Sequence, residues 1–519
     1  MNYLMGIDVG TTGTKAAIID DSGNLIAQAY REYTCAYPCP GWVEQDANML
    51  LETTFVVAAE ALRKASLPPD VICSIAFSAQ RCCTIAVGRD GKLVRPMISW
   101  QDNRTAEEIE LIRKEVNDDD FYDIVRLPQS TTWMLSKILW LQRHEPEAWA
   151  RVHKVVQLHD FLLYSWGAGE FYVDHCDAAF YGCWDTAQLK WSDRLLKVGH
   201  VTAEKLSIPR ANGDRVGGVS EIVAKATGLK AGTPLCIGAG DQNSGALGAG
   251  VVCPHLLSVS LGTGGAVCAC VDHAFHDASR RTMVTNHVMK DLWLVEGYQA
   301  GAASVFRWFR DQFAELESAY AKMAGRDTYD ILTELISKAP VGSKGLLLMP
   351  YFASAGTPRW NSAARGTLIG MTFAHDRYCM ARAFIEGITL EVRDMLESLV
   401  KAGVTFERVH LLGGPTKSSL WNQIQADVYG HPVCTLVNGD AAVTGAAILG
   451  GVGVGVFKDA ASGVENLVKM KTLYRPDEAN TARYNDLYEV YKNLYTALDN
   501  AKIYQQIAEF QRKYGELEK

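Results

Sequence analysis

Two glycine-rich turns contain residue types that bind a phosphate chain and its metal ion. The first is Gly10-Thr11-Thr12-Gly13, between apolar segments at 5–9 and 16–19, a pattern that predicts two strands joined by a tight turn. Its glycines permit positive φ and close backbone approach, so backbone N–H groups and threonine hydroxyls can face an anion. Asp8 comes just before the turn, where its carboxylate can hold the phosphate's Mg²⁺, directly or through water.

An ordinary glycine-rich hairpin would show the same pattern, but a second copy favours the phosphate site. Gly262-Thr263-Gly264 lies between residues 258–261 and 265–267, about halfway along the chain. One such hairpin in each half predicts a duplicated domain, with a phosphate chain held between the copies.

Length, charge and cysteine content narrow the class of protein. A chain of 519 residues is too long for one hydrophobic core, which predicts two domains, 1–253 and 254–519. The net charge of −8 argues against nucleic acid as a partner. The 13 cysteines lack zinc-site spacing, which favours reduced thiols and a cytoplasmic location. We expect neither a signal peptide nor a membrane partner, because Asp8 interrupts the first apolar run and residues 441–456 are too short and glycine-rich to span a bilayer.

Further motifs follow one another in an order typical of one family. They are Gly41-Trp42-Val43-Glu44-Gln45-Asp46, a pattern of Thr, Trp, Ser and Lys over 131–141, the stretch at 235–243, a pattern over 366–387, and Gly413-Gly414. With the paired hairpins, these motifs resemble the FGGY family of carbohydrate kinases. The resemblance implies an α/β fold of two actin-like (ribonuclease-H-like) ATPase domains with a cleft between them. It assigns sugar binding and the catalytic base to 1–253, and nucleotide binding with a helical tail to 254–519.

The stretch at 235–243 is an apolar strand followed by a glycine turn that projects Asp241 and Gln242. The resemblance implies that Asp241 takes the proton of the substrate hydroxyl and shares the metal site with Asp8. An alcohol is a weak nucleophile, so a carboxylate within hydrogen-bond reach can accept its proton as the bond to phosphorus forms. The alternative is an aspartate that caps a helix over 244–251.

Four more residues are candidates for substrate binding. Gln80 and Arg81 end a predicted strand, and strand ends in this architecture face the ligand. The planar guanidinium of Arg81 suits a sugar's hydroxyls, and Gln80-Arg81 resembles the "NQRE" stretch of the glycerol-kinase branch, with Cys82 in place of its Glu. Trp100 is a candidate apolar wall, and Asp102 resembles the aspartate of the family's "W.D.R" pattern. The alternatives are a core tryptophan and a surface-loop aspartate.

The resemblance implies ATP and Mg²⁺ as cofactors. The candidate nucleotide-binding residues are Thr11, Thr12, Gly13, Lys15, Gly262, Thr263, Gly264, Gly301, Gly413, Gly414 and Ser418. The family places adenine and ribose at the paired glycines, while Ser418 also suits a helix N-cap. Small residues over 445–455 predict close helix packing. The helical pattern over 484–514 predicts a packing helix or a homodimer contact.

The predicted reaction is transfer of the γ-phosphoryl group of ATP to a primary hydroxyl of a small sugar. The stretches at 356–361 and 364–366 favour a ketopentose such as D-xylulose, whereas Gln80-Arg81 favours another polyol or a signal molecule, such as glycerol, erythritol or autoinducer-2. A competing class is an actin-like nucleotide-binding regulator that hydrolyses ATP without transfer to a sugar.

Overall fold

The computed structural model describes residues 1–39 and 41–514, which form two compact units. The first consists of Met1–Cys253, Cys270–Val295 and Asp440–Lys469, and the second consists of the chain between and after these segments. Two segments expected in the second domain, 270–295 and 440–469, therefore fold with the first unit. Residues 515–519 of the expected second domain lie outside the described part.

The first unit is built on a six-stranded sheet with the order β13-β14-β5-β1-β2-β3. The strands are β1 (Tyr3–Val9), β2 (Gly13–Asp20), β3 (Leu25–Glu32), β5 (Ile72–Ala79), β13 (Arg215–Gly218) and β14 (Pro234–Gly240). β1 pairs antiparallel with β2 and parallel with β5, and β14 pairs parallel with β5. The hairpin predicted at the start of the chain is confirmed.

Alternate residues of β1 and β2 enter two separate cores, as the period of a strand requires. Met5, Ile7 and Ile18 pack with residues of α1 (Ala47–Ala65) and α6 (Leu158–Trp166), whereas Leu4 and Ile19 pack with residues of α16 (Ala441–Gly453). Helices therefore cover both faces of the sheet, which explains why the central strands are almost continuously apolar.

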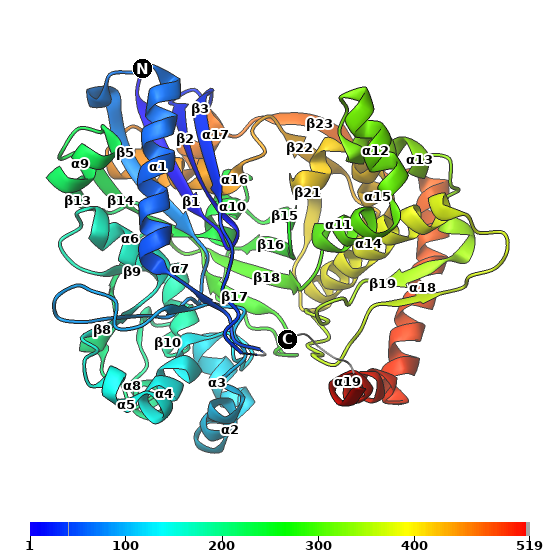
Figure 1. Ribbon diagram of the computed structural model, residues 1–519, viewed down its shortest axis with the longest axis horizontal. Helices are drawn as coiled ribbons and strands as arrows, with labels where there is room; N and C mark the ends of the chain where they lie inside the picture. Colours follow the sequence, from blue (N-terminus) through cyan, green and yellow to red (C-terminus); the bar gives the residue numbers. More distant parts are fainter. Residues whose placement is uncertain (40, 515–519) are drawn as a thin grey trace. The chain divides into compact units, whose positions relative to one another are not determined.

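The helix α16 packs closely against α10 (Asp241–Gly248) through small residues. A Cβ atom on Gly445 would lie 1.9 Å from the carbonyl oxygen of Ser244, and one on Gly248 would lie 1.9 Å from that of Ala441. A Cβ on Gly6 would likewise lie 2.2 Å from the carbonyl oxygen of Val443. The close helix packing expected from the small residues is confirmed, and a late segment of the chain completes the first unit (Figure 1).

The remaining elements of the first unit surround this sheet. The helices are α2 (Ala106–Glu115), α3 (Asp118–Val125), α4 (Met134–His144), α5 (Pro146–Trp149), α7 (His175–Ala178), α8 (Asp193–Val198), α9 (Glu221–Thr227) and α17 (Ala460–Leu467). The short strands are β4 (Glu44–Gln45), β6 (Ile85–Val87), β7 (Met97–Ile98), β8 (Lys154–Val156), β9 (Tyr172–Asp174), β10 (Trp184–Asp185), β11 (Lys190–Trp191) and β12 (Ile208–Arg210).

A second sheet has the order β17-β18-β16-β15-β21-β22-β23. Its strands are β15 (His255–Leu261), β16 (Gly265–Val271), β17 (Met283–Asn286), β18 (Trp293–Gln299), β21 (Phe406–Gly413), β22 (Val433–Leu436) and β23 (Met470–Tyr474), and a separate pair is β19 (Leu347–Met349) with β20 (Thr367–Ile369). The helices of the second unit are α11 (Ala303–Phe313), α12 (Glu315–Ala324), α13 (Thr328–Ile336), α14 (Arg377–Lys401), α15 (Ser419–Tyr429), α18 (Glu478–Asn500) and α19 (Ile503–Tyr514). β15 and β16 repeat the antiparallel hairpin of β1 and β2, and β15 pairs parallel with β21, as β1 does with β5. The helical tail predicted over 484–514 is confirmed by α18 and α19.

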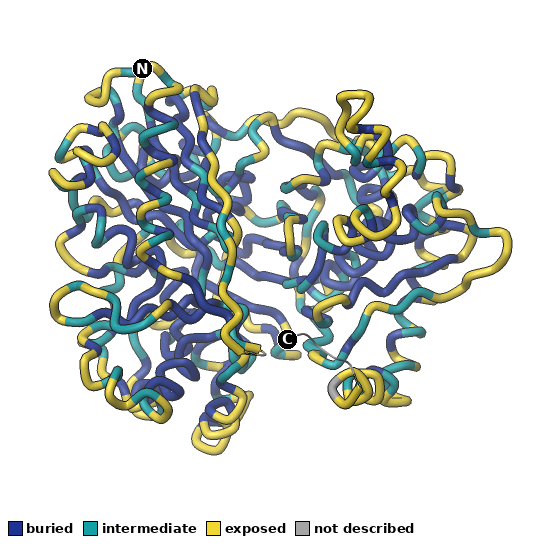
Figure 2. The backbone as a smooth tube through the Cα atoms, in the orientation of Figure 1, coloured by how far each residue is buried: buried dark blue, intermediate teal, exposed yellow. Residues whose placement is uncertain are grey.

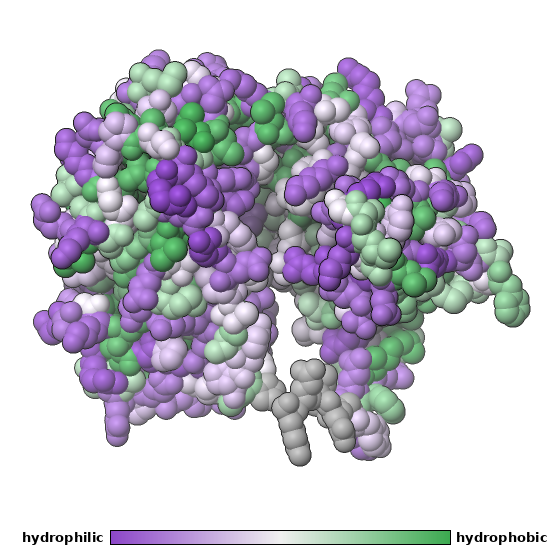
Figure 3. Space-filling view, turned by 45° about the horizontal axis from the view of Figure 1, so that its top comes forward, coloured by the Kyte–Doolittle hydropathy of each residue, from purple (hydrophilic) through white to green (hydrophobic). Residues whose placement is uncertain are grey.

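Burial follows the two sheets. Figure 2 shows the central strands of each sheet as buried, with exposed residues along the edge strand β3, in loops and on outer helices. Hydrophilic and hydrophobic residues are interspersed on the face seen in Figure 3. No helix within the described residues combines the length and the apolar character needed to cross a bilayer.

Candidate functional site

The turn of the first hairpin is partly exposed, and two charged residues lie beside it. The N–H of Gly10 donates to the carbonyl oxygen of Gly13 at 3.0 Å, which closes the turn. Asp8 and Lys15 are direct partners in the β1–β2 register. The turn is fixed by side chains from elsewhere, because the Tyr33 hydroxyl donates to the Gly10 carbonyl at 2.7 Å.

Asp8 is held close to other carboxylates. Burial raises the pKa of Asp8 to about 7; the nearby charges of Asp241 and Asp440 also raise it, while the hydrogen bond from Ser78 and the charge of Lys15 lower it. The Lys15 ammonium lies 2.5 Å from an oxygen of Asp440, and its charge also acts on Asp8. Carboxylate oxygens are the ligands that a hard divalent cation prefers, and the expected Mg²⁺ therefore fits the chemistry of this group.

Asp241 is the first residue of α10, at the point where β14 ends. The helix thus begins three residues earlier than expected, and Gly240 occupies the N-cap position instead of an aspartate. An Asp241 oxygen accepts from the backbone N–H of Gln242 at 2.8 Å. The side chain remains about one-third exposed (32%), so its carboxylate is accessible to a substrate.

Arg81, one of the substrate residues expected from the sequence, lies beside Asp241. Its Nε lies 3.4 Å from Asp241 Oδ1, and its Nη1 donates to Asn243 Oδ1 at 3.2 Å. Its guanidinium lies over the Phe180 ring, 4.3 Å from the centroid. Next to it, burial and the charge of Asp174 raise the pKa of Asp177 well above its usual range, while the charge of Arg81 lowers it. The structure therefore brings Arg81 and Asp241 together.

Gln80 and Trp100 are linked to the first hairpin by hydrogen bonds. Gln80 donates to Gln45 at 2.8 Å, and Gln45 donates to the carbonyl oxygen of Thr11 at 2.9 Å. The Trp100 indole N–H donates to the Thr11 hydroxyl at 2.9 Å. These contacts tie the loop that carries Trp100 to the turn beside Asp8.

Asp102 is placed differently from the other substrate candidates. It is fully buried, and its carboxylate accepts from the backbone N–H of Val43 at 2.6 Å and from Arg104 at 2.7 and 2.9 Å. The Arg104 guanidinium in turn lies 3.8 Å from the centroid of the Trp42 ring. In this structure Asp102 supports the loop and does not face solvent.

Lys137 has a positioning role that sequence analysis did not assign to it. Its buried ammonium donates to the carbonyl oxygens of Cys82, Ser99 and Thr132 at 2.8–3.0 Å. Burial lowers the pKa of Lys137 to about 8. Cys82 follows Arg81 and Ser99 precedes Trp100, so one side chain fixes two loops that carry substrate candidates. The sequence feature that could have indicated this role is a lysine within the apolar stripe of a predicted helix.

The second hairpin is held by backbone contacts at the start of a helix. Its turn closes with a 2.9 Å bond from the N–H of Gly262 to the carbonyl oxygen of Gly264. The N–H groups of Ala302 and Ala303 donate to the carbonyl oxygens of Thr263 and Gly262 at 3.0 and 2.9 Å. Gly301 therefore lies next to this turn, just before α11.

The paired glycines lie beside the second hairpin in the sheet. Gly413 is the register partner of Leu261 and has a φ of +90°, and a Cβ there would lie 2.3 Å from the Leu261 carbonyl oxygen. A Cβ on Gly414 would meet nothing within 4 Å, so its surface is open. The Ser418 hydroxyl caps α15 by accepting from the N–H of Trp421 at 3.2 Å. The structure thus brings the second-half candidates together within one unit.

The stretch at 356–361 has structural partners within the second unit. Arg359 donates to Asp394 at 2.8 Å and lies 4.2 Å from the Tyr495 ring centroid, and Asn361 donates to Tyr495 and Asp499 at 3.1 Å. The side chains of Arg359 and Asn361 therefore stabilise the second unit, and the sugar preference inferred from this stretch stays a prediction.

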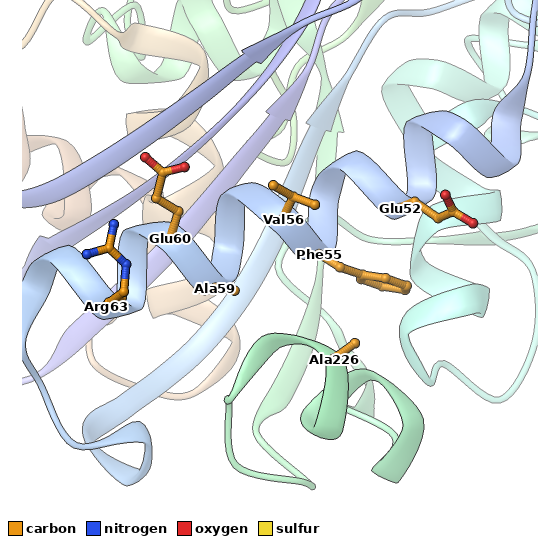
Figure 4. A pocket seen from close by; sticks show the side chains of 7 residues that line it. All are labelled: Glu52, Phe55, Val56, Ala59, Glu60, Arg63 and Ala226. Carbon is orange, nitrogen blue, oxygen red and sulfur yellow. The ribbon is translucent and has the colours of Figure 1, made fainter.

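A surface pocket elsewhere contains none of the expected site residues. It lies between α1 and α9 and is lined by Glu52, Phe55, Val56, Ala59, Glu60, Arg63 and Ala226 (Figure 4). A possible metal-ligand group, Glu107, Glu108 and His144, also lies apart from them, and Arg143 already forms ion pairs with both glutamates.

Two family models match most of the chain. Residues 3–248 match the N-terminal domain of the FGGY family of carbohydrate kinases, and residues 257–454 match its C-terminal domain. The motifs that suggested the resemblance therefore belong to a similarity that extends over both halves.

Similar proteins carry three different substrate names. A xylulose kinase from Bacillus subtilis is 28% identical, with 96% of this chain and 97% of the relative covered. A gluconokinase from the same organism is 28% identical with 98% of each covered. An autoinducer-2 kinase from Escherichia coli is 30% identical with 95% and 94% covered. A solved xylulose kinase from Lactobacillus acidophilus has the same fold, with a TM-score of 0.87, 24% identity and 96% and 99% of the two chains covered.

Proposed function

Because the chain belongs to the FGGY family of carbohydrate kinases, we propose that it phosphorylates a primary hydroxyl of a ketopentose such as D-xylulose. Enzymes of this family are ATP-dependent sugar phosphotransferases with an actin-like α/β fold of two domains. The names of the relatives favour transfer to a sugar over the alternative of an ATP-hydrolysing regulator.

The observation that carries the mechanism is the position of Asp241 at the junction of β14 and α10. Its carboxylate is accessible and lies 3.4 Å from Arg81. As general base, Asp241 accepts the proton of the sugar hydroxyl while that oxygen bonds to the γ-phosphorus. The Arg81 guanidinium, beside this carboxylate, donates hydrogen bonds to other hydroxyls of the sugar.

The remaining roles divide between the two hairpins. Thr11, Thr12, Gly13 and Lys15 contact the transferred phosphoryl group, whereas the second-unit turn and Gly413-Gly414 hold the rest of the nucleotide. Trp100 and Gln242 orient the sugar. Asp8 and Asp241 would hold Mg²⁺, which when bound neutralises phosphate charge.

D-Xylulose is supported by the names of several relatives, and gluconate and autoinducer-2 are supported in the same way. The substrate is tested by coupled ADP release with D-xylulose, gluconate, glycerol, erythritol and autoinducer-2. We expect the highest kcat/KM with D-xylulose, and a higher value with another compound would replace it.

The base is tested by Asp241→Asn, which keeps the size of the side chain. We expect kcat to fall by at least about 10³-fold, because the hydroxyl loses its proton acceptor. ATP affinity, measured by calorimetry, should change by less than about threefold. Turnover close to that of the wild type would refute the assignment of the base.

A further inference from the structure

The strand that leads to Asp241 contains a β-bulge. Leu235 and Cys236 pair with Ile75 and Ala76 of β5, but beyond the irregularity Ala239 and Gly240 pair with Ser78 and Ala79. β14 therefore has one residue more than β5 over this interval. Since a shift of one residue turns each later side chain to the opposite face of a strand, the bulge sets the direction in which Asp241 leaves the sheet.

Gly238 lies within this bulge, and its backbone is tightly enclosed. A Cβ there would lie 1.7 Å from the carbonyl oxygen of Phe77, so only glycine fits. Its own carbonyl accepts from Asn212 Nδ2 at 2.7 Å. Its N–H donates at 3.2 Å to Nε2 of His159, from the first turn of α6. The bulge thus removes this amide from the ladder, and an imidazole takes the place of the missing acceptor.

The contacts of His159 determine its tautomer. Nε2 must be unprotonated to accept from Gly238, so the ring proton is on Nδ1. Nδ1 lies 3.5 Å from Asp160 Oδ1, without a hydrogen bond between them. The other oxygen of Asp160 accepts from the Tyr181 and Ser207 hydroxyls at 2.7 Å. Both His159 and Asp160 are buried, so the side chains packed around the ring limit its movement, and its hydrogen bond is the one to Gly238.

We infer that His159 is a positioning residue for phosphoryl transfer, because its Nε2 holds the bulge that aims Asp241. The inference rests on the proposed function only in treating Asp241 as the base. It predicts that loss of the Nε2 acceptor loosens residues 237–241 and lowers the rate of the chemical step, while nucleotide binding in the second unit is kept.

The test compares three variants with the wild type. His159→Phe removes the acceptor and keeps a planar ring, whereas His159→Gln provides an amide oxygen at a similar reach. Tyr122→Phe is the matched control, since it also removes one buried bond to the backbone, from its hydroxyl to the Thr282 carbonyl, away from β14. Hydrogen exchange of the peptide over 236–242 is measured by mass spectrometry without ligand. kcat and KM are measured with ATP and the sugar that the wild type phosphorylates fastest.

In His159→Phe we expect exchange over 236–242 to be about tenfold faster and kcat to fall about 10- to 100-fold. KM for ATP should stay within about threefold of the wild-type value. His159→Gln should recover most of both losses, and Tyr122→Phe should change neither. Unchanged exchange in His159→Phe would overturn the inference, as would faster exchange with unchanged kcat.

Failure of the proposed function has a different signature. If Asp241 is not the base, Asp241→Asn retains turnover whatever the His159 variants do. The exchange measurement does not depend on catalysis, so it tests the hold of His159 on the bulge in either case.

Discussion

The two glycine-rich hairpins have similar backbones and very different surroundings. The first has Asp8 opposite Lys15, whereas Ser260 and Ala266 occupy the corresponding register positions beside the second turn. The first turn is held by side chains of Tyr33 and Gln45, and the second mainly by the start of α11. In our proposal the same kind of turn is used twice, once beside charged groups that serve the chemistry and once with backbone groups that bind the nucleotide.

The strongest test of this difference is Asp8→Asn. In our proposal Asp8 would help to hold the Mg²⁺ that neutralises phosphate charge, so we expect kcat to fall about 10²–10³-fold. Thr263→Val in the second hairpin should mainly raise KM for ATP, by about three- to tenfold. Steady-state kinetics with varied ATP and sugar measures both, and equal effects on kcat would contradict the division of roles.

Stability against pH provides a second test, because the folded pKa of Asp8, about 7, lies above its ordinary value of 3.8. The folded state therefore binds this proton more tightly, and the resulting stabilisation is present below about pH 4 and lost as the pH rises through 7. Asp8→Asn should raise the free energy of unfolding more at pH 8.5 than at pH 5, by roughly 2–3 kcal/mol. Urea denaturation at both pH values measures this difference. An identical change at the two pH values would show that the pKa of Asp8 is not raised in the folded state.

The smallest expected effects come from single hydrogen bonds to each turn. Tyr33→Phe removes the 2.7 Å bond to Gly10, and Ser304→Ala removes a 2.6 Å bond to Thr263. Each should cost about 0.5–1.5 kcal/mol of stability. Tyr33→Phe should lower kcat and Ser304→Ala should raise KM for ATP, each by less than about fivefold. The reverse assignment of kcat and KM would contradict the comparison.

Local motifs predicted the parts of the site that are formed by neighbouring residues. The strand–turn–strand pattern around Gly10 and the strand leading to Asp241 both depend on residues adjacent in sequence, and both were placed correctly. The contacts of Lys137 were not predicted, because its three acceptors come from segments around 82, 99 and 132, and no local sequence pattern shows that these segments lie close together. The bulge at Gly238 was not expected, since it appears only when β14 is paired with β5.

The domain boundary that the sequence predicts near residue 253 could not reveal that residues 440–469 fold with the first unit. Ala441 and the residues after it are helical and rich in small side chains, a pattern that fits either domain. Their assignment depends on the close fit of Gly445 against Ser244 and of Val443 against Gly6, which are hundreds of residues away along the chain.

The folding of residues 440–469 with the first unit has a consequence for synthesis on the ribosome. Strands β1, β2 and β14 leave the exit tunnel early, but one face of their sheet lacks its cover until about residue 469 has been made. A nascent chain therefore carries an exposed apolar surface, of the kind that chaperones bind, over much of its elongation. A messenger truncated before codon 440 should give a product that aggregates, even though it encodes every strand of the first sheet.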